Sequence, residues 1–310
     1  MGRTELGVHL PPRDHGGDGP RLAAALGVEP SAILDLSQSL NPSAPDPRSV
    51  LARHLDAVGR YPDERPARHA LAAALDVDPD LVVLTNGGSE AISLVARHQP
   101  VGSVVDPEFS LYRRALERVD AAAPRWRSNP HSPTGLLAGA EETAGVWDEA
   151  FFPLATGRWT RGDHDDGATV VGSLTKLFAC PGLRVGFVIA PEDRTADALR
   201  RLQPEWSVSA LATESLCDLL DTTDLTAWSS SVAKLRSELV DLFVDHDLAV
   251  RDTDANWVLV DDATLRGRLM VHGIASRDCS SFGWTDVVRV AVPDAAGLER
   301  LAAALGRDST

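Results

Sequence analysis

The residues with the clearest chemical potential lie in one stretch, residues 170–187. An apolar run there ends in a small-polar turn that holds Lys176, with hydroxyl groups at Ser173 and Thr175. A lysine between two apolar strands loses solvation, so we expect its pKa to fall. Such a lysine can form a Schiff base with an aldehyde, while Arg184 and the hydroxyls suit a phosphate. The alternative is a lysine that only extends its ammonium from a strand end into water.

Three further positions carry groups that fit the same chemistry. Gly88 and Ser89 follow a short strand and open a helix, where free backbone N–H groups favour an anion. Asp148 follows a strand among aromatic residues and would suit a protonated pyridine nitrogen. Arg277 and Arg289 lie in apolar stretches, where a buried guanidinium needs an anion. Together these groups fit pyridoxal phosphate. A tight turn, an exposed aspartate and structural ion pairs are the alternatives.

Composition limits the classes of function. The formal net charge of −15 argues against partners such as nucleic acid or an anionic membrane. Three cysteines without a C-x-x-C pair argue against disulfides and zinc, and fit a cytoplasmic protein. Asp163-His-Asp-Asp166 could resemble metal ligands but is interpreted as a solvated loop, so no metal site is expected. Residues 1–12 lack the apolar core of a signal peptide, and no apolar run approaches the ~20 residues of a membrane span.

The elements around these residues follow the pattern of an α/β protein. A strand at 81–84, a glycine turn, a helix to residue 98 and a strand at 103–105 alternate as in a parallel sheet. Apolar periodicity predicts helices over 48–58 and 109–119. We predict an N-terminal arm with part of the small domain (1–47), a large cofactor-binding domain (48–205), and connecting helices with a small α+β C-terminal domain (206–310).

Several short motifs occur in a characteristic order along almost the whole chain. They are His15-Gly-Gly, Arg60-Tyr-Pro-Asp63, Asn86-Gly-Gly-Ser-Glu-Ala91, Asn129-Pro-His-Ser-Pro-Thr-Gly135, Asp148-Glu-Ala-Phe151, Ser173 to Phe187, Pro204 to Ala210, and Arg277 to Phe282. Together they resemble the pyridoxal-phosphate enzymes of the aspartate aminotransferase fold, fold type I. Within that fold, the sequence looks most like the threonine-phosphate decarboxylases of cobalamin biosynthesis, and next like the histidinol-phosphate aminotransferases.

The resemblance implies a three-layer, mostly parallel sheet, a pyridoxal 5'-phosphate cofactor and a homodimer with shared active sites. Lys176 would carry the cofactor and Asp148 would hold its pyridinium. The implied cofactor ligands are Gly88, Ser89, Ser173, Thr175 and Arg184 at the phosphate, Tyr61 from a second subunit, Phe109 stacked on the ring, and Ser132 and Phe151 beside it. The implied ligands of a small phosphorylated amino-acid substrate are Arg289 at the carboxylate, Arg277 and His15 at the phosphate, and Ser39.

Three departures from the family pattern bear on activity. Ser132 stands where asparagine is usual and Phe151 where tyrosine is common, and both usual residues hydrogen-bond the cofactor's 3-oxygen. The chain is also short, because 136–145 hold one or two helical turns at most, whereas a parallel crossover needs a dozen or more residues. We therefore expect part of one sheet face to be bare or covered by a partner.

These observations leave three hypotheses for the activity. The leading one is a lyase that decarboxylates L-threonine O-3-phosphate to (R)-1-amino-2-propanol O-2-phosphate. The first alternative is an aminotransferase of the histidinol-phosphate type. The second alternative is a shortened, non-catalytic homologue that works as a binding or partner subunit, since a fold by itself does not imply a function.

Overall fold

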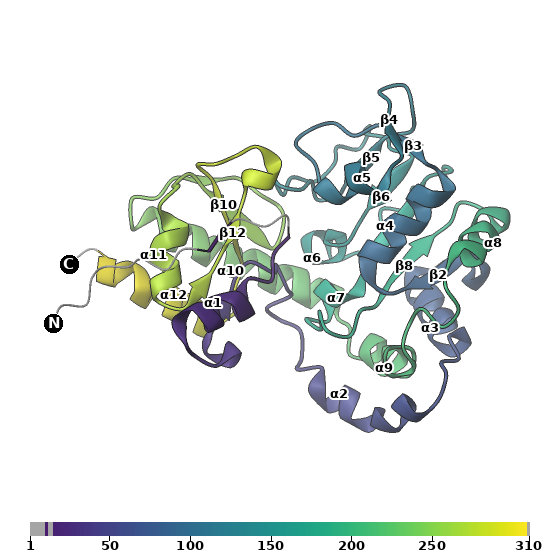
Figure 1. The fold of residues 1–310 in the computed structure, drawn as a ribbon, viewed down its shortest axis with the longest axis horizontal. Coiled ribbons are helices and arrows are strands. Elements are labelled where there is room, and N and C mark those ends of the chain that lie inside the picture. Colours follow the sequence, from purple (N-terminus) through teal and green to yellow (C-terminus); the bar gives the residue numbers. More distant parts are fainter. Residues whose placement is uncertain (1–9, 12–14, 309–310) are drawn as a thin grey trace.

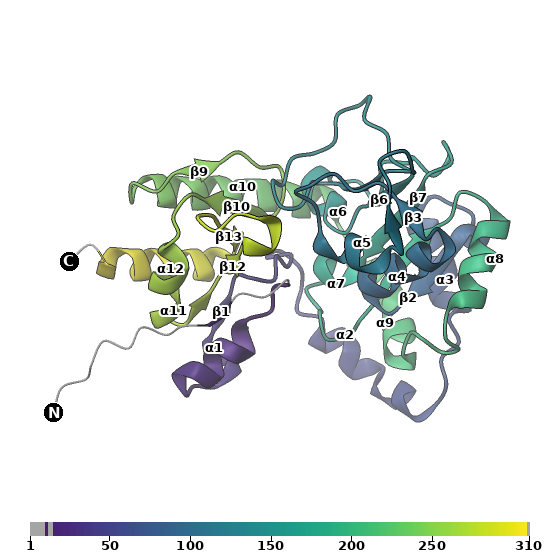
Figure 2. The same cartoon turned by 45° about the horizontal axis from the view of Figure 1, so that its top comes forward.

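The computed structural model describes residues 10–11 and 15–308, which form two lobes (Figure 1). The large lobe is built on a five-stranded sheet and the small lobe on a four-stranded sheet. Helix α10 (Leu225–Val244) runs between them in both views (Figure 2). Its Trp228 belongs to the core of the large lobe, whereas its Leu239 and Phe243 belong to the core of the small lobe. One continuous helix therefore holds the two lobes together.

The five-stranded sheet has the order β2-β8-β7-β6-β5, and β8 is the antiparallel strand in it. This confirms the expected mostly parallel sheet. The strands are β2 (Val82–Thr85), β8 (Gly186–Ile189), β7 (Thr169–Ser173), β6 (Val146–Asp148) and β5 (Trp126–Ser128). Beyond β5, a bridge from Ser103 to Arg125 leads to the paired strands β3 (Val101–Gly102) and β4 (Arg118–Val119).

Side chains alternate between the two faces of this sheet. Along β2, Val82 packs into one core cluster and Val83 into another, and Val170 and Val171 of β7 divide in the same way. Because both faces are apolar, helices cover both sides and three layers result. The first side carries α2 (Arg48–Arg53), α3 (Arg65–Leu75), α6 (Phe152–Thr156) and α9 (Ala210–Asp221), and the second carries α4 (Gly87–His98), α5 (Ser110–Ala115) and α8 (Asp193–Leu202).

Two helices differ from the expectation. The expected helix 48–58 divides into α2 and a 3-10 turn at Leu55–Gly59. The expected helix 109–119 stops at Ala115, since Arg118 and Val119 leave it to pair with β3. Hydrogen bonding to a neighbouring strand therefore outweighs the apolar periodicity at this point.

Loops cover the sheet where the chain is short. Residues 136–145 contain no helix, yet Trp147 of β6 is fully buried. The Arg161 guanidinium carbon lies 4.8 Å from the Trp147 ring centroid, and Arg161 forms an ion pair with Asp163 at 3.0 Å. Its Nη groups also donate to the carbonyls of Gly139, Ala140 and Glu142. At Trp147 loops of the same chain thus cover the sheet, in place of the bare or partner-covered face that was expected. The loop 163–166, expected to be solvated, is 86% exposed at the Asp165 side chain and 18% exposed at the Asp163 side chain.

The small lobe is an antiparallel sheet of order β12-β13-β10-β9 with one face packed on helices. Val288 and Val290 of β13 point into the apolar core, so Arg289 between them faces the other way, toward the large lobe. The remaining elements are α1 (Gly19–Leu26), β1 (Leu34–Asp35), β9 (Val250–Arg251), β10 (Trp257–Val260), α11 (Leu265–Val271), β11 (Ile274–Ala275), β12 (Arg277–Asp278), β13 (Val288–Ala291) and α12 (Ala295–Asp308). Among the described residues, no helix has the length and apolar character needed to cross a bilayer.

Candidate active site

A cavity of about 330 Å³ is lined by residues of both lobes. The ends of β6 and β7, the start of α4 and the outward face of the small-lobe sheet all reach it. Every candidate residue except Tyr61 and Ser39 lines it. The lining candidates are His15, Gly88, Ser89, Phe109, Ser132, Asp148, Phe151, Ser173, Thr175, Lys176, Arg184, Arg277 and Arg289.

Lys176 lies on α7 (Leu174–Leu177), the single helical turn that follows β7. Its Nζ donates a hydrogen bond to the backbone carbonyl of Gln38 at 2.8 Å. Burial is the main cause that lowers the pKa of Lys176 to about 8, and the charges of Arg289, Arg277 and Arg184 act in the same direction. Lys176 therefore has the depressed proton affinity that the sequence led us to expect, and the uncharged amine becomes available at mildly alkaline pH.

One end of the cavity is the glycine–hydroxyl corner, which we define as Gly88, Ser89, Ser173, Thr175 and Arg184. Gly88 and Ser89 belong to the first turn of α4, where backbone N–H groups have no acceptor within the helix. The hydroxyl oxygens of Ser173 and Thr175 lie 2.8 Å apart. Backbone donors, hydroxyls and one guanidinium thus converge as they do in phosphate sites.

The Arg184 side chain reaches this corner because Gly87 leaves room for it. Gly87 has a φ of +75°, and a Cβ added there would lie 2.5 Å from Arg184 Nη2. Arg184 itself has a φ of +58°. Within the described part of the chain, its guanidinium contacts two backbone carbonyls, those of Pro181 and Asn86, and forms no ion pair. An incoming anion would therefore find this cation unneutralised.

Asp148 closes the cavity at the end of β6. Its carboxylate accepts hydrogen bonds from Tyr112 Oη at 2.8 Å and from the Ala150 N–H at 3.1 Å. Burial raises the pKa of Asp148 above its usual range, and no cation among the described residues offsets that effect. Tyr112 was missed at the sequence level, although its position three residues after Phe109 places both on one face of a helix start.

The opposite end of the cavity carries the arginine pair, Arg277 and Arg289, which face each other across β12 and β13. Their exposed fractions are 6% and 3%. Their guanidinium carbons lie over the rings of Phe282 and Trp257, at 4.8 and 4.7 Å from the centroids. Like charges directly opposite each other destabilise a sheet. Such a pair is favourable when an anion lies between the two groups.

Arg289 shows this need for an anion most clearly. Its Nε and Nη1 atoms are buried and have no hydrogen-bond partner among the described residues. Burial, and then the charge of Arg277, lower the pKa of Arg289 well below its usual range. A buried guanidinium without acceptors is costly. Arg289 is therefore prepared for an anionic group that enters the cavity.

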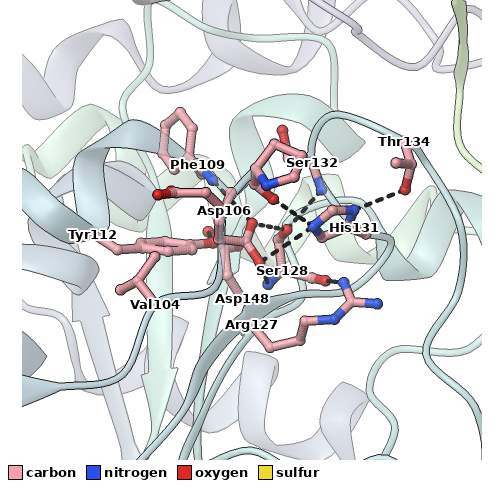
Figure 3. A network of polar contacts seen from close by, with 12 residues as sticks. Val104, Asp106, Phe109, Tyr112, Arg127, Ser128, His131, Ser132, Thr134 and Asp148 are labelled. Atoms are coloured by element: carbon pink, nitrogen blue, oxygen red, sulfur yellow. Dashed lines mark hydrogen bonds and ion pairs between the residues drawn. The ribbon is translucent and has the colours of Figure 1, made fainter. Parts of the chain in front are cut away.

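The two unusual positions of the sequence, Ser132 and Phe151, both line the cavity. The Ser132 N–H donates to Ser128 Oγ at 2.7 Å (Figure 3). Phe151 packs edge-on against Trp257, with ring centroids 4.8 Å apart. Phe151 thus makes a packing contact but lacks the hydroxyl group that the common tyrosine would offer for a hydrogen bond. Ser128, which sequence reasoning missed, adds a hydroxyl to the cavity lining.

The structure places Tyr61 and Ser39 outside the cavity. Tyr61 is 75% exposed and stacks on Trp206, with ring centroids 4.4 Å apart. Ser39 is 1% exposed, and its Oγ is buried without a partner among the described residues. Its backbone carbonyl instead accepts a hydrogen bond from Asn256. Contact between Ser39 and the substrate therefore stays a prediction, whereas its neighbour Gln38 lines the cavity.

Comparison with known proteins identifies the family. Residues 126–305, more than half of the chain, match the family model described as aminotransferase class I and II. The chain belongs to this family. It is 31% identical to the threonine-phosphate decarboxylase of Salmonella typhimurium, covering 94% of this chain and 95% of that one. It is 27% identical to the histidinol-phosphate aminotransferase of Halobacterium salinarum, covering 92% and 93%.

A solved structure shows the same fold. The histidinol-phosphate aminotransferase from Sinorhizobium meliloti in complex with pyridoxal-5'-phosphate has a TM-score of 0.79 and 19% identity, over 98% of this chain and 96% of that one. The class I and II family depends on pyridoxal phosphate, and this chain is a pyridoxal-phosphate enzyme of the aminotransferase or decarboxylase kind.

The residues of the cavity fit this cofactor. The half-buried Asp148 carboxylate has no cation beside it among the described residues and suits a ring nitrogen, while the unneutralised Arg184 suits a phosphate. Lys176, whose pKa is lowered to about 8, lies between these two groups in the chain and lines the same cavity. The structure thus contains acceptors and donors for the ring, the phosphate and the aldehyde of the group.

Proposed function

We propose that this enzyme decarboxylates L-threonine O-3-phosphate to (R)-1-amino-2-propanol O-2-phosphate, as in cobalamin biosynthesis. The observation that carries the proposal is the buried arginine pair, which lines the same cavity as His15 and the glycine–hydroxyl corner. Two anion-binding places remain after the corner has taken a cofactor phosphate, and this substrate has two anionic groups. The similarity to the Salmonella decarboxylase supports the same choice.

The side chains divide the work as follows. The bound cofactor supplies an electron sink for the bond that breaks at the substrate's Cα. Lys176 donates the proton that replaces the lost carboxyl group at that carbon, and Asp148 keeps a proton on the ring nitrogen. Arg289 binds the carboxylate, and Arg277 and His15 bind the substrate phosphate. By fixing both ends of the substrate, these residues choose which Cα bond stands perpendicular to the ring.

An aminotransferase of the histidinol-phosphate type is the second candidate, favoured by the 27% identity to the Halobacterium enzyme. Incubation of the purified protein with the cofactor and threonine phosphate separates the two. We expect release of carbon dioxide and formation of the phosphorylated amino alcohol. Formation of a keto acid that requires an added 2-oxo acid would support the aminotransferase and rule out the decarboxylase.

Lys176→Ala tests whether this protein is an enzyme at all. Lys176 and Lys234 are the two lysines of the sequence, so borohydride fixation of the cofactor to a lysine has two possible targets. We expect fixation at Lys176 alone, and its loss together with turnover in Lys176→Ala. Lys234 is 79% exposed at its side chain, and Lys234→Ala is the matched control. A colourless protein that takes up no cofactor would leave the non-catalytic alternative.

We also propose that the enzyme is a homodimer in which Tyr61 completes the partner's glycine–hydroxyl corner. Tyr61 and Trp206 are stacked yet 75% and 57% exposed, and Leu55 and Val58 nearby in the chain are 58% and 72% exposed. Apolar residues grouped in this way are typical of interaction surfaces. Sedimentation should show a dimer. A monomer that binds the cofactor tightly would contradict the proposal.

A further inference from the structure

Two side chains at the end of β1 hold a stretch of backbone from near the start of the chain. Ser37 Oγ accepts hydrogen bonds from the N–H groups of Gly17 and Asp18, at 2.8 and 3.1 Å. Asp35 Oδ2 accepts one from the N–H of Gly19, at 2.9 Å. Three consecutive N–H groups therefore end on two side chains of another segment, and this backbone takes its position from them.

The Asp35 carboxylate organises the contact. Its Oδ1 accepts from the Ser37 N–H at 3.0 Å and from Ser37 Oγ at 2.5 Å, and its Oδ2 also accepts from Gln38 Nε2 at 2.6 Å. Since the Ser37 hydroxyl gives its one hydrogen to Asp35, its two acceptor positions are left for the N–H groups of residues 17 and 18. A carboxylate, which only accepts, therefore fits all of these donors.

The held backbone carries His15 to the cavity. His15 is exposed and lines the cavity, and its ring centroid lies 5.4 Å from that of Phe109. Gly16, the next residue, packs directly on Ser37, because a Cβ added to Gly16 would lie 1.9 Å from the Ser37 carbonyl oxygen. An exposed side chain has little packing to fix it, so the place of His15 depends on the backbone that carries it.

The segment that holds this backbone is itself fixed to the lysine. The Gln38 carbonyl accepts the hydrogen bond from Lys176 Nζ. The Asn41 N–H donates to the Lys176 carbonyl at 3.0 Å, and Asn41 Nδ2 donates to the Leu177 carbonyl at 3.0 Å. The segment therefore sets the N-terminal backbone relative to the lysine as well as to the small lobe.

We propose that Asp35 and Ser37 are positioning residues, which place His15 at the cavity before an anionic group of the substrate arrives. They act through the backbone of residues 16–19, whereas His15 contacts the anion. A side chain that is placed in advance loses less conformational freedom on binding, and this raises the affinity. The choice of a phosphate as that anion rests on the proposed function, but the hydrogen bonds that place His15 do not.

Phosphate binding by the cofactor-saturated protein measures whether Asp35 acts on the cavity. Inorganic phosphate is the probe, and titration calorimetry gives its Kd. We expect His15→Ala to raise this Kd about 10-fold, since it removes one charge-assisted hydrogen bond. Asp35→Asn keeps the size of the side chain but turns an amide NH2 toward donors, so we expect a similar rise of about 10-fold.

The double variant decides between positioning of His15 and an independent effect. If Asp35 acts through His15, adding Asp35→Asn to His15→Ala should leave the Kd for phosphate unchanged. A further rise of about 10-fold would show that the two residues act independently and would overturn the proposal. An unchanged Kd in His15→Ala alone would overturn it as well.

Hydrogen exchange shows whether the held backbone is released. We expect the amides of residues 17–19 to exchange about 10-fold faster in Asp35→Asn and in Ser37→Ala, because their acceptors are lost. Ser37→Ala should also raise the Kd for phosphate, and it serves if Asp35→Asn does not fold. Unchanged exchange in these variants would show that other contacts hold the backbone, and would overturn the proposal.

Asp46→Asn is the matched control. Asp46 Oδ1 likewise accepts from the N–H two residues further on, that of Arg48, but its side chain is 53% exposed. The exchange of residues 17–19 and the Kd for phosphate should stay unchanged in this variant. These measurements need no turnover, so a protein that behaves as expected here but releases no carbon dioxide from threonine phosphate would refute the proposed decarboxylase alone.

Discussion

The two ends of the cavity bind anions by different physical means. The glycine–hydroxyl corner offers backbone N–H groups, two hydroxyls and the partly solvated Arg184, all at the junctions of strands and helices. The arginine pair offers two buried guanidiniums on adjacent strands, one of them with unused donors. The corner is therefore stable when empty, whereas Arg289 of the pair carries a desolvation cost until an anion arrives.

This difference teaches how one cavity can hold a cofactor permanently and a substrate briefly. Many weak neutral donors hold a phosphate without a large penalty when it is absent. Buried like charges penalise the ligand-free state, and that penalty is relieved by the ligand. We expect substitutions at the arginine pair to act on turnover, and substitutions at the corner to act on cofactor affinity.

Arg289→Met should give the largest effect. Methionine is similar in length to arginine but carries no charge. The value of kcat/KM for an anionic substrate should therefore fall by about 10³-fold. The free energy of unfolding of the ligand-free protein should stay equal or rise by about 1 kcal/mol, because the desolvation cost disappears. Steady-state kinetics and urea unfolding measure the two. Arg194→Met, at a residue whose side chain is 85% exposed, is the control. A variant with a lower free energy of unfolding and normal turnover would contradict the expectation that the arginine pair serves the substrate at a cost in stability.

Gly87→Ala should come next and act on the corner alone. The added Cβ meets the Arg184 guanidinium and sits on a backbone with φ of +75°, so the cofactor Kd should rise about 10- to 100-fold. A titration of the visible absorbance against added cofactor measures it. Gly139→Ala, where nothing lies within 4 Å of the new Cβ, should leave the Kd unchanged.

Ser173→Ala and Thr175→Val should each weaken the cofactor about 5-fold, since each removes one neutral hydrogen bond. Their hydroxyls lie 2.8 Å apart and share a hydrogen. The double variant should therefore lose less than the sum of the two single losses. Strict additivity in the binding free energies would mean that the two hydroxyls act separately.

The smallest effect concerns the proton of Lys176. Its pKa is lowered to about 8, and Arg289 contributes more to this than Arg184. Lys176 should thus react with a small aldehyde increasingly as the pH rises through about 8, because the neutral amine is the nucleophile. The midpoint should move to higher pH in Arg289→Met, and by less in Arg184→Met. Equal shifts of the pH midpoint in the two variants would mean that Arg289 and Arg184 affect the pKa of Lys176 equally.

Much of the glycine–hydroxyl corner can be predicted from the sequence, because its residues lie in short segments of the chain. A strand, a glycine turn and a helix start produce unpaired N–H groups wherever they occur, as at Gly88 and Ser89. Lys176, Ser173 and Thr175 lie within four residues, so their proximity needs no knowledge of the fold. The family motifs, the mostly parallel sheet and the cofactor follow from the same short-range patterns.

The tertiary structure alone decided the contacts between distant segments. Ser128 meets Glu108 across 20 residues, and Asp148 meets Tyr112 across 36, so neither pair leaves a spacing signal in the sequence. Arg161 covers Trp147 where a helix is missing, and the apolar periodicity of the sequence does not predict this contact. Which carboxyl has a raised pKa, and which arginine has donors without partners, depends on burial. Burial is set by how whole elements pack together, whereas turn and helix-start chemistry is set by a few adjacent residues.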